Sequence, residues 1–415
     1  MANNIVLWFI KSFCATYQSG LADNLFLTNS CYYVLINNIY MEQIKQRLWI
    51  VTELFPPDET STSYILGQIA NAMAKKYQVK IICGPEIYDK RKKLDENNHF
   101  CLDKSIEVFR ANGADLDKNT TKGKALSFLL MSKRMISLVK QHVRKDDKVL
   151  MVTNPAPLVV LMSRLKKKVG FELNILVHDV FPENTKPAGL KLPLYGMIKH
   201  VFDNAYSHAD QLIALGGDMK DVLEKKVLNN SENIPKITII ENWADINGIK
   251  SQSMPQGKIV LEYAGNIGRV QGLDKVIEQL PESVDFHIYG TGSMEETLKK
   301  MNHPRVFFHG PYFRSQQNEV LAACHMALVT LQEGMYGLGV PSKTYNILAS
   351  GRPILFFGPK NSEIDLLVRE KRIGYCGWPE KWDMDELVKM GERARELAIK
   401  EYSEATILNK FIKAI

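Results

Sequence analysis

A lysine in the first turn of a predicted helix carries a positive charge where a helix does not favour one. The stretch GVPSKTYNILASGRPIL (339–355) predicts a helix that begins near Pro341 and Ser342, ends at Gly351, and is followed by a buried strand. A helix dipole favours negative charge at its N-terminus. Lys343 therefore either points to solvent or lies beside a bound anion.

A second stretch, YAGNIGRVQGLDKVIEQL (263–280), predicts a strand, a glycine-containing loop and a helix. The loop contains Gly265, Asn266, Arg269 and Gln271. Glycines at such a turn let backbone N–H groups approach a phosphate, and an arginine adds a fixed positive charge. An ordinary turn is the better interpretation of this loop when it is taken alone. The dinucleotide spacing G-x-G-x-x-G is absent, which argues against a Rossmann dehydrogenase.

Further candidates follow other strands of the same half of the chain. Gly290 and Gly292 lie in YGTGS (289–293), and His309 lies at the end of the next strand. The carboxyl ends of parallel strands meet at one edge of a sheet, so we expect these residues near Lys343. Cations and a helix N-terminus suit a diphosphate, and small residues leave room for a base and a ribose. The combination predicts a nucleoside diphosphate site.

Polar residues also follow strands in the first half of the chain. Glu53 ends the first strand, Ser61 and Thr62 precede the next helix, and His178 and Asp179 follow a buried strand. Each has a structural interpretation as well. Glu53 suits a strand end, Ser61 and Thr62 suit helix caps, His178 suits a buried core position, and Asp179 suits a turn cap.

Short apolar strands alternate along the chain with longer segments of helical spacing, such as 63–77 and 122–144. This alternation predicts parallel strands joined by crossover helices. The first series comprises strands at 47–54, 79–84, 106–111, 148–153, 173–180, 211–216 and 237–242, and the second comprises strands at 259–265, 284–290, 305–310, 326–331, 353–358 and 373–377. We therefore expect an α/β protein with two doubly wound, Rossmann-like domains.

The domain boundaries follow from a polar break that contains Gly and Pro. We expect an N-terminal domain at 41–245, a linker at 246–257 and a C-terminal domain at 258–390. Residues 391–415 predict a C-terminal helix that crosses back to the first domain. Ligands of such sheets bind beyond the carboxyl ends of the strands, so the cleft between the two domains is the expected site.

Composition limits the class of protein. The 415 residues are 45% hydrophobic and 24% charged, and the net charge of +7 suits an acidic small molecule or an anionic membrane surface better than nucleic acid. Six scattered cysteines favour a reducing, cytoplasmic compartment over a zinc site or a disulfide framework. Residues 1–40 lack the basic region of a signal peptide, and we interpret them as a non-native or disordered extension rather than a membrane anchor.

Taken together, the motifs resemble bacterial family 4 glycosyltransferases, which have the GT-B fold and use nucleotide-sugars. The branch that they resemble most builds O-antigen and capsule repeats and includes N-acetyl-L-fucosamine transferases. The resemblance covers about 42–410 and rests on four stretches in family order: TELFPPDETSTSYILGQIANAMA (52–74), VHDVFPEN (177–184), YAGNIGRVQGLD (263–274) and VPSKTYNILASGRPIL (340–355).

The resemblance implies a retaining transfer of a sugar from a nucleotide-sugar, UDP-linked, to a polyprenyl-diphosphate saccharide, with no metal and no cofactor. It places the acceptor beside Glu53, Ser61 and Thr62, and it gives His178 and Asp179 catalytic roles. The donor contacts that it implies are Gly265, Asn266, Arg269, Gln271, Gly290, Gly292, His309, Ser342, Lys343 and Asn346.

Two departures from the family pattern matter. Many members carry Arg and Lys where this chain has Asn266 and Gln271. Many also carry two glutamates eight residues apart, where this chain has Leu338 and Asn346. Glu333 is the nearest acid and is retained as a catalytic candidate. A nucleotide-sugar 2-epimerase of the same fold and a non-catalytic nucleotide-sugar-binding subunit therefore stay open as alternatives.

A basic segment, TKGKALSFLLMSKRMISLVKQHVRK (121–145), has two interpretations. With RLKKKVGF (164–171) it suits contact with an anionic membrane, as a lipid-linked acceptor at the cytoplasmic face of the inner membrane would require. It equally suits an ordinary helix that packs on the core and exposes a charged face.

Overall fold

The computed structural model describes residues 45–86, 100–113, 121–228 and 234–415, except the side chains of 121, 122, 124 and 125. The predicted extension at 1–40 lies outside the described residues. By its contacts the chain divides at Gln46, and both sheets belong to the unit Arg47–Ile415.

Seven parallel strands form the first sheet, in the order β3-β2-β1-β4-β5-β6-β7. The inner strands are rich in Val, Ile and Leu that are buried on both faces, as a sheet covered by crossover helices requires, and the edge strands β3 and β7 are half-buried. The strands are β1 (Arg47–Thr52), β2 (Gln78–Cys83), β3 (Glu107–Arg110), β4 (Lys148–Val152), β5 (Glu172–Leu176), β6 (Gln211–Ala214) and β7 (Lys236–Ile239).

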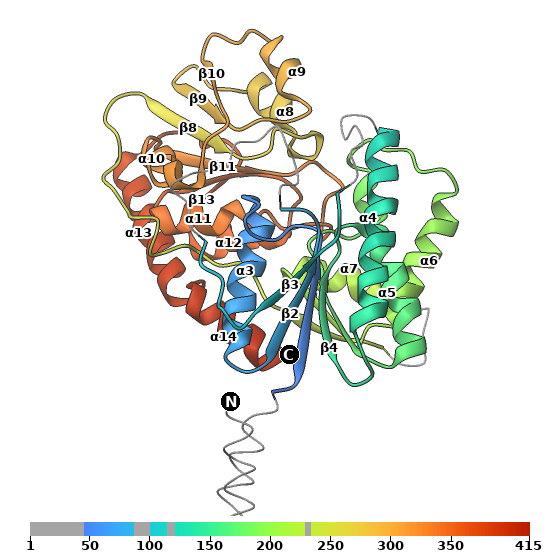
Figure 1. The fold of residues 1–415 in the computed structure, drawn as a ribbon. Coiled ribbons are helices and arrows are strands. Elements are labelled where there is room, and N and C mark those ends of the chain that lie inside the picture. The colour runs from blue at the N-terminus through green and yellow to red at the C-terminus, as the bar shows by residue number, and fades with distance from the viewer. Residues whose placement is uncertain (1–44, 87–99, 114–120, 229–233) are drawn as a thin grey trace, which may run out of the picture. The chain divides into compact units, whose positions relative to one another are not determined.

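Helices cover both faces of this sheet (Figure 1). On one side α3 (Ser61–Ala74) contacts the C-terminal helix α14 (Glu404–Ala414). On the other side four helices contact one another in chain order: α4 (Thr121–His142), α5 (Ala156–Val169), α6 (Tyr195–Ser207) and α7 (Gly217–Val227). The arrangement is that of a doubly wound sheet.

Six parallel strands form the second sheet, in the order β10-β9-β8-β11-β12-β13. They are β8 (Ile259–Ala264), β9 (Val284–Tyr289), β10 (Val306–Gly310), β11 (Met326–Thr330), β12 (Ile354–Phe357) and β13 (Gly374–Cys376). The helices between them are α8 (Leu273–Glu278), α9 (Glu295–Lys299), α10 (Gln317–Ala322), α11 (Lys343–Ser350) and α12 (Glu363–Lys371).

Each sheet has one point at which its strand order reverses. In the first sheet β1 lies between β2 and β4, and in the second β8 lies between β9 and β11. Loops that leave the carboxyl ends of the strands diverge at such switch points, which is where doubly wound sheets bind their ligands. Polar side chains near the β1/β4 and β8/β11 switch points are therefore the first candidates for ligand contacts.

All thirteen predicted strands are present, with bounds that differ by a few residues. The predicted helix that starts at Ser342 is α11, with Ser342 as N-cap and Gly351 as a left-handed C-cap at φ +67°. The predicted C-terminal helix at 391–415 is wrong as a single element. The chain forms α13 (Met384–Lys400) and α14, because the Ser403 side chain accepts from the Thr406 N–H and starts a new helix.

The polar break at 246–257 is held in place by two arginines. Arg395 of α13 donates to the carbonyls of Ile246 and Ile249 at 3.1 and 2.9 Å. Arg352 donates to the carbonyls of Gln252 and Ser253 at 2.9 and 3.1 Å. Arg352 also donates to Leu321 and Ala322, and its side chain is buried. The arginine of the LASGRP motif thus anchors the connecting segment to α10.

The basic segment at 121–145 contains α4, and the exposure of its apolar side chains differs between the two halves of the helix. Ile136 and Val139 are buried in the core, as the packing interpretation expects. Leu126 and Leu129 are each 48% exposed. Only the N-terminal half of the helix therefore keeps the apolar surface that membrane contact would need.

Candidate active site

Lys343 points inward. Its Nζ lies 3.3 Å from the centre of the Tyr263 ring, and it is buried without a hydrogen-bond acceptor among the described residues. Burial lowers the pKa of Lys343 to about 7, although the carboxyl group of Glu262 acts in the opposite direction. The interpretation of this residue as a solvated surface lysine is therefore wrong. An amine buried at a helix N-terminus without an acceptor is suited to receiving an anion.

Gly265 and Gly290 bring two loops together beside Lys343. A Cβ on Gly290 would lie 1.9 Å from the Gly265 carbonyl oxygen, and a Cβ on Gly265 would lie 3.2 Å from Lys343 Nζ. Both glycines have positive φ, +148° at Gly265 and +123° at Gly290. A Cβ on Gly292 would similarly lie 2.2 Å from the carbonyl oxygen of Ile267. The sequence therefore needs glycine here because main chain packs on main chain.

Hydrogen bonds continue the sheet beyond the ends of these strands. The N–H groups of Gly265 and Ile267 donate to the carbonyls of Tyr289 and Thr291, each at 2.9 Å, and the Gly290 N–H donates to Gly310 at 2.6 Å. The loops after β8, β9 and β10 thus form one backbone surface beside the β8/β11 switch point.

Arg269 begins the short helix η2 (Arg269–Gln271) and is exposed. It makes no ion pair with any residue that the structure describes. The Gln271 side-chain oxygen is buried without a donor, and a Cβ on Gly268 would lie 2.7 Å from both that oxygen and the Asn266 amide nitrogen. Arg269, Asn266 and Gln271 therefore share one loop, with polar atoms that the described fold does not pair.

His309 lies at the end of β10, away from Lys343 in the sheet order. Its ring stacks on Tyr289 with centroids 4.3 Å apart, and its Nε2 lies 3.2 Å from Nδ1 of His287. Burial lowers the pKa of both histidines, and the pKa of His287 is lowered further by His309. The aromatic surface of Tyr289 and His309 flanks the glycine loops and offers a stacking face.

His178 and Asp179 meet the peptide that leads into α11. Asp179 forms an antiparallel bridge with Gly339, and the Val180 N–H donates to the Leu338 carbonyl at 3.0 Å. The N–H groups of His178 and Asp179 lie 3.2 and 3.3 Å from the Thr153 hydroxyl. The structure therefore connects the HDVFPEN motif of the first domain to the GVPSK motif of the second through backbone contacts.

The ring of His178 is neutral at physiological pH. Its Nε2 is buried without a hydrogen-bond partner among the described residues, and burial lowers its pKa to about 4. Asp179, its neighbour in the chain, is exposed. The pair thus offers an uncharged imidazole and a solvated carboxylate at the same loop.

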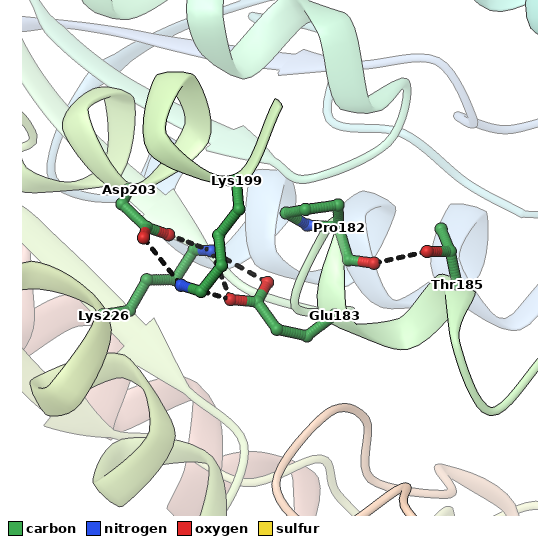
Figure 2. Close-up of polar contacts among 6 residues, drawn as sticks. All are labelled: Pro182, Glu183, Thr185, Lys199, Asp203 and Lys226. Carbon is green, nitrogen blue, oxygen red and sulfur yellow. Dashed lines mark hydrogen bonds and ion pairs between the residues drawn. The ribbon is translucent and has the colours of Figure 1, made fainter. Parts of the chain in front are cut away.

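Four charged side chains form an ion-pair network that includes Glu183 of the HDVFPEN loop (Figure 2). The Lys226 ammonium, buried, contacts Glu183 at 2.8 Å and Asp203 at 2.6 Å. Lys199 contacts the same two carboxylates at 2.9 and 2.6 Å. The Thr185 hydroxyl donates to Pro182 at 2.6 Å. Buried charges require such pairing, so this network is the reason for the glutamate of the motif.

The acceptor-side candidates surround the β1/β4 switch point. Glu53 is buried at the end of β1, and its carboxylate accepts from the Asn154 amide at 3.2 Å. The N-cap of α3 is Thr60, whose hydroxyl accepts from the Ser63 N–H at 3.3 Å. The interpretation of Ser61 and Thr62 as caps is therefore wrong, because both lie inside the first turn.

The Lys343 amine has no hydrogen-bond partner among the described residues, so neither Asn346 nor Glu333 is hydrogen-bonded to it. The Asn346 oxygen accepts from the Asp245 N–H, and its amide donates to Gln317, both at 3.1 Å. Its side chain therefore holds the connecting segment and α10, which leaves it few groups for a donor. Glu333 is exposed in the loop after β11, and Leu338 is buried.

Sequence reasoning missed three residues that the structure makes prominent. Glu262 is a buried carboxylate in the middle of β8, where the pattern indicated only a core strand. Glu183 and Arg352 stood inside quoted motifs but received no role. A charged residue within an apolar strand was the signal that could have identified Glu262, because such residues are rarely buried without a partner.

Two features are absent from the part of the chain that the structure describes. Within it, no group of three or more His, Cys, Asp or Glu side chains is arranged to hold a metal ion. Within it, too, no helix has the length and apolar character needed to cross a bilayer.

Comparison with known proteins shows the family to which this chain belongs. No protein-family model matches the chain. The chain is 30% identical over 404 residues to the probable glycosyltransferase WbjE of Pseudomonas aeruginosa, covering 89% of this chain and 97% of that protein. It is 30% identical over 194 residues to the putative colanic acid biosynthesis glycosyl transferase WcaI of Escherichia coli, covering 41% and 47%. Neither name is that of an epimerase or a binding subunit.

Solved structures share the two-sheet fold and each match 89% of this chain. Sucrose-phosphate synthase of Thermosynechococcus elongatus has a TM-score of 0.65 at 12% identity, over 98% of its length. HepE of Anabaena in complex with UDP has 0.60 at 13%, over 99%. WaaG, a glycosyltransferase involved in lipopolysaccharide biosynthesis, has 0.58 at 15%, over 99%. This chain belongs to the glycosyltransferases, and its two parallel-sheet domains have the GT-B architecture.

Proposed function

We propose that this enzyme is a retaining glycosyltransferase that moves a sugar from a UDP-linked donor to a lipid-linked saccharide. The observation that carries the donor assignment is the Lys343 amine, buried at the N-terminus of α11 without a hydrogen-bond acceptor among the described residues. A diphosphate would supply the acceptor, and the helix dipole favours the same charge. HepE, which shares the fold, was solved with UDP.

The remaining donor contacts follow from the loops around Lys343. The backbone surface of Gly265, Gly290 and Gly292 leaves room for a nucleotide beside the diphosphate, and the Tyr289 ring offers a stacking face for a base. Arg269 supplies a second cation from an exposed position in the β8 loop. The Ser342 hydroxyl makes no cap hydrogen bond and can therefore donate to a phosphate oxygen.

The chemical role of these cations is to stabilise the leaving group. As the bond between the sugar and the diphosphate breaks, negative charge grows on the diphosphate, and Lys343, Arg269 and the α11 N-terminus offset it. These groups can do so without a metal ion. His178 is neutral and therefore suited to hydrogen bonding with a sugar hydroxyl, while Asp179 is suited to orienting the acceptor.

We assign the enzyme to the synthesis of a bacterial surface polysaccharide such as O-antigen or capsule. WcaI is named for colanic acid biosynthesis, and WaaG is described as acting in lipopolysaccharide biosynthesis. The sugar is expected to be an N-acetylated deoxy-aminosugar, and the acceptor a polyprenyl-diphosphate saccharide at the cytoplasmic face of the inner membrane. The exposed Leu126 and Leu129, near Lys133 and Arg134 on α4, provide a surface for anionic lipid.

A transfer assay tests this proposal directly. Purified enzyme is incubated with UDP-linked N-acetylated aminosugars and a membrane lipid extract, and the lipid-linked product is identified by mass spectrometry. Retention predicts the same anomeric configuration in donor and product by NMR. Epimerised nucleotide-sugar without acceptor would indicate an epimerase instead, and UDP binding without transfer to any extract would indicate a binding subunit.

A further inference from the structure

A small polar cavity lies directly behind Lys343, between β8 and the helices α10 and α11. Its volume is about 10 Å³, at the lower limit for holding one water molecule. Its polar lining comes from Glu262, Tyr312, Gln317 and Lys343, and the remaining lining is apolar. The cavity therefore joins the buried lysine to a buried carboxyl group.

Neither end of this cavity is satisfied in the fold. The Lys343 Nζ and one carboxylate oxygen of Glu262 are both buried without a hydrogen-bond partner among the described residues. Burial raises the pKa of Glu262 to about 8 and lowers that of Lys343 to about 7. An ion pair without further hydrogen bonds is costly in such surroundings, so both shifts favour the neutral forms when the site is empty.

The other groups around Glu262 do not take its proton. Arg352 contributes positive charge, but its N–H groups are occupied by four backbone carbonyls. Burial raises the pKa of the Cys324 thiol, which keeps it protonated beside Glu262. Burial and Glu262 itself also raise the pKa of Tyr289 and Tyr312.

The surroundings of Lys343 are similarly neutral. The Tyr263 ring lies over its amine, and burial raises the pKa of that phenol well above its usual range. Glu262 is thus the one acid among these neighbours that could share a proton with the lysine.

We propose that Glu262 is the proton donor to Lys343: when the diphosphate binds, the proton on the Glu262 carboxyl group passes through the cavity to the amine. The O–H bond of the acid breaks, an N–H bond forms on Lys343, and one bridging water relays the proton. The site gains an ammonium at the phosphate and a carboxylate beside Arg352, with no net proton taken from solvent. The inference rests on the proposed donor site, and it makes Glu262 a positioning residue for charge rather than a catalytic one.

Calorimetry of UDP binding tests this inference. UDP is titrated into the full chain near pH 7.5 in two buffers with different ionisation enthalpies, because the dependence of the observed heat on buffer gives the number of protons taken up. We expect a number near zero for the wild type. We expect about one proton for Glu262→Gln, in which Lys343 must draw its proton from solvent. The double variant Glu262→Gln with Lys343→Met is expected to return to about zero.

The outcomes separate this inference from the donor assignment. Uptake of about one proton by the wild type, or of none by Glu262→Gln with UDP still bound, would overturn the role of Glu262 alone. If UDP fails to bind the wild type, the donor site and this inference fall together. Should Glu262→Gln not fold, the wild-type proton number still decides, and Cys324→Ser, which alters the neighbour but keeps the acid, must behave as the wild type.

Discussion

The two switch points of this enzyme differ in how their polar groups are paired. At the β1/β4 switch point one oxygen of the buried Glu53 carboxylate accepts from the Asn154 amide at 3.2 Å. At the β8/β11 switch point Lys343, Glu262 and Gln271 each keep a buried polar atom without a partner among the described residues. Native folds rarely leave such atoms unpaired. The unpaired atoms of the second switch point lie where we propose that the donor binds.

Removal of the lysine is the strongest way to break this contrast. We predict that Lys343→Ala lowers turnover about 100-fold or more, the effect of losing one donor to a developing oxyanion, while the protein remains folded. Steady-state release of UDP in the transfer assay measures it. Lys275→Ala, which removes an exposed lysine of α8, is the matched control and should retain turnover. Near wild-type turnover in purified Lys343→Ala would show the diphosphate assignment to be wrong.

The pH dependence of stability tests the burial of His178, in the loop whose backbone contacts the peptide before α11. The pKa of His178 is about 4 in the fold and about 6.5 in the unfolded chain, so the unfolded chain binds more protons between these values. The free energy of unfolding should therefore fall by about 3 kcal/mol as the pH drops through this window.

We predict that His178→Gln lacks this loss. Urea unfolding at about pH 7 and pH 4.5 measures the difference between the two proteins. The exposed His200 provides the control substitution, His200→Gln, which should follow the wild type. An equal loss in His178→Gln and the wild type would mean that the imidazole is solvated.

A pair of glycine substitutions tests the backbone contact between the two loops at the second switch point. Gly290→Ala forces a Cβ against the Gly265 carbonyl, whereas Gly310→Ala meets no atom within 4 Å although its φ is also positive, at +76°. We predict that Gly290→Ala costs about 2 kcal/mol more than Gly310→Ala, because only the former adds steric overlap to backbone strain. Thermal unfolding measures both. Equal costs would contradict the close approach of the two loops.

The smallest expected effect concerns the first switch point. Asn154→Ala removes the amide that hydrogen-bonds Glu53 and should lower stability by about 1–2 kcal/mol. Lys343→Met, by contrast, removes an unpaired buried amine and should not lower stability. Chemical unfolding of both variants tests the contrast between the switch points, which would be lost if Lys343→Met were the less stable protein.

Local signals predicted much of this fold. Strands such as β8 and β12 are short Val-, Leu- and Ile-rich runs that end beside glycines, and α11 has sequence signals at both ends. The division of the C-terminal segment into α13 and α14 was not predicted, because the break depends on Ser403 acting as a cap. Periodicity is similar on either side of that residue.

The candidate site was less predictable than the fold. The spacing of GVPSK identified Lys343 as a residue of interest, but its inward direction depends on Tyr263, which lies eighty residues earlier in the sequence. Asn346 illustrates the same dependence on tertiary contacts. It lies on the same helix, yet tertiary contacts with Asp245 and Gln317 occupy its side chain. Helical position alone cannot distinguish these two outcomes.

The glycine loops after β8, β9 and β10 have a consequence for evolution. Their shape is fixed by N–H and carbonyl groups, as in the bonds from Gly265 to Tyr289 and from Gly290 to Gly310. Main-chain groups are common to all residue types, so the flanking side chains can change over generations while the surface stays the same. The fold itself is shared with solved structures at only 12–15% identity.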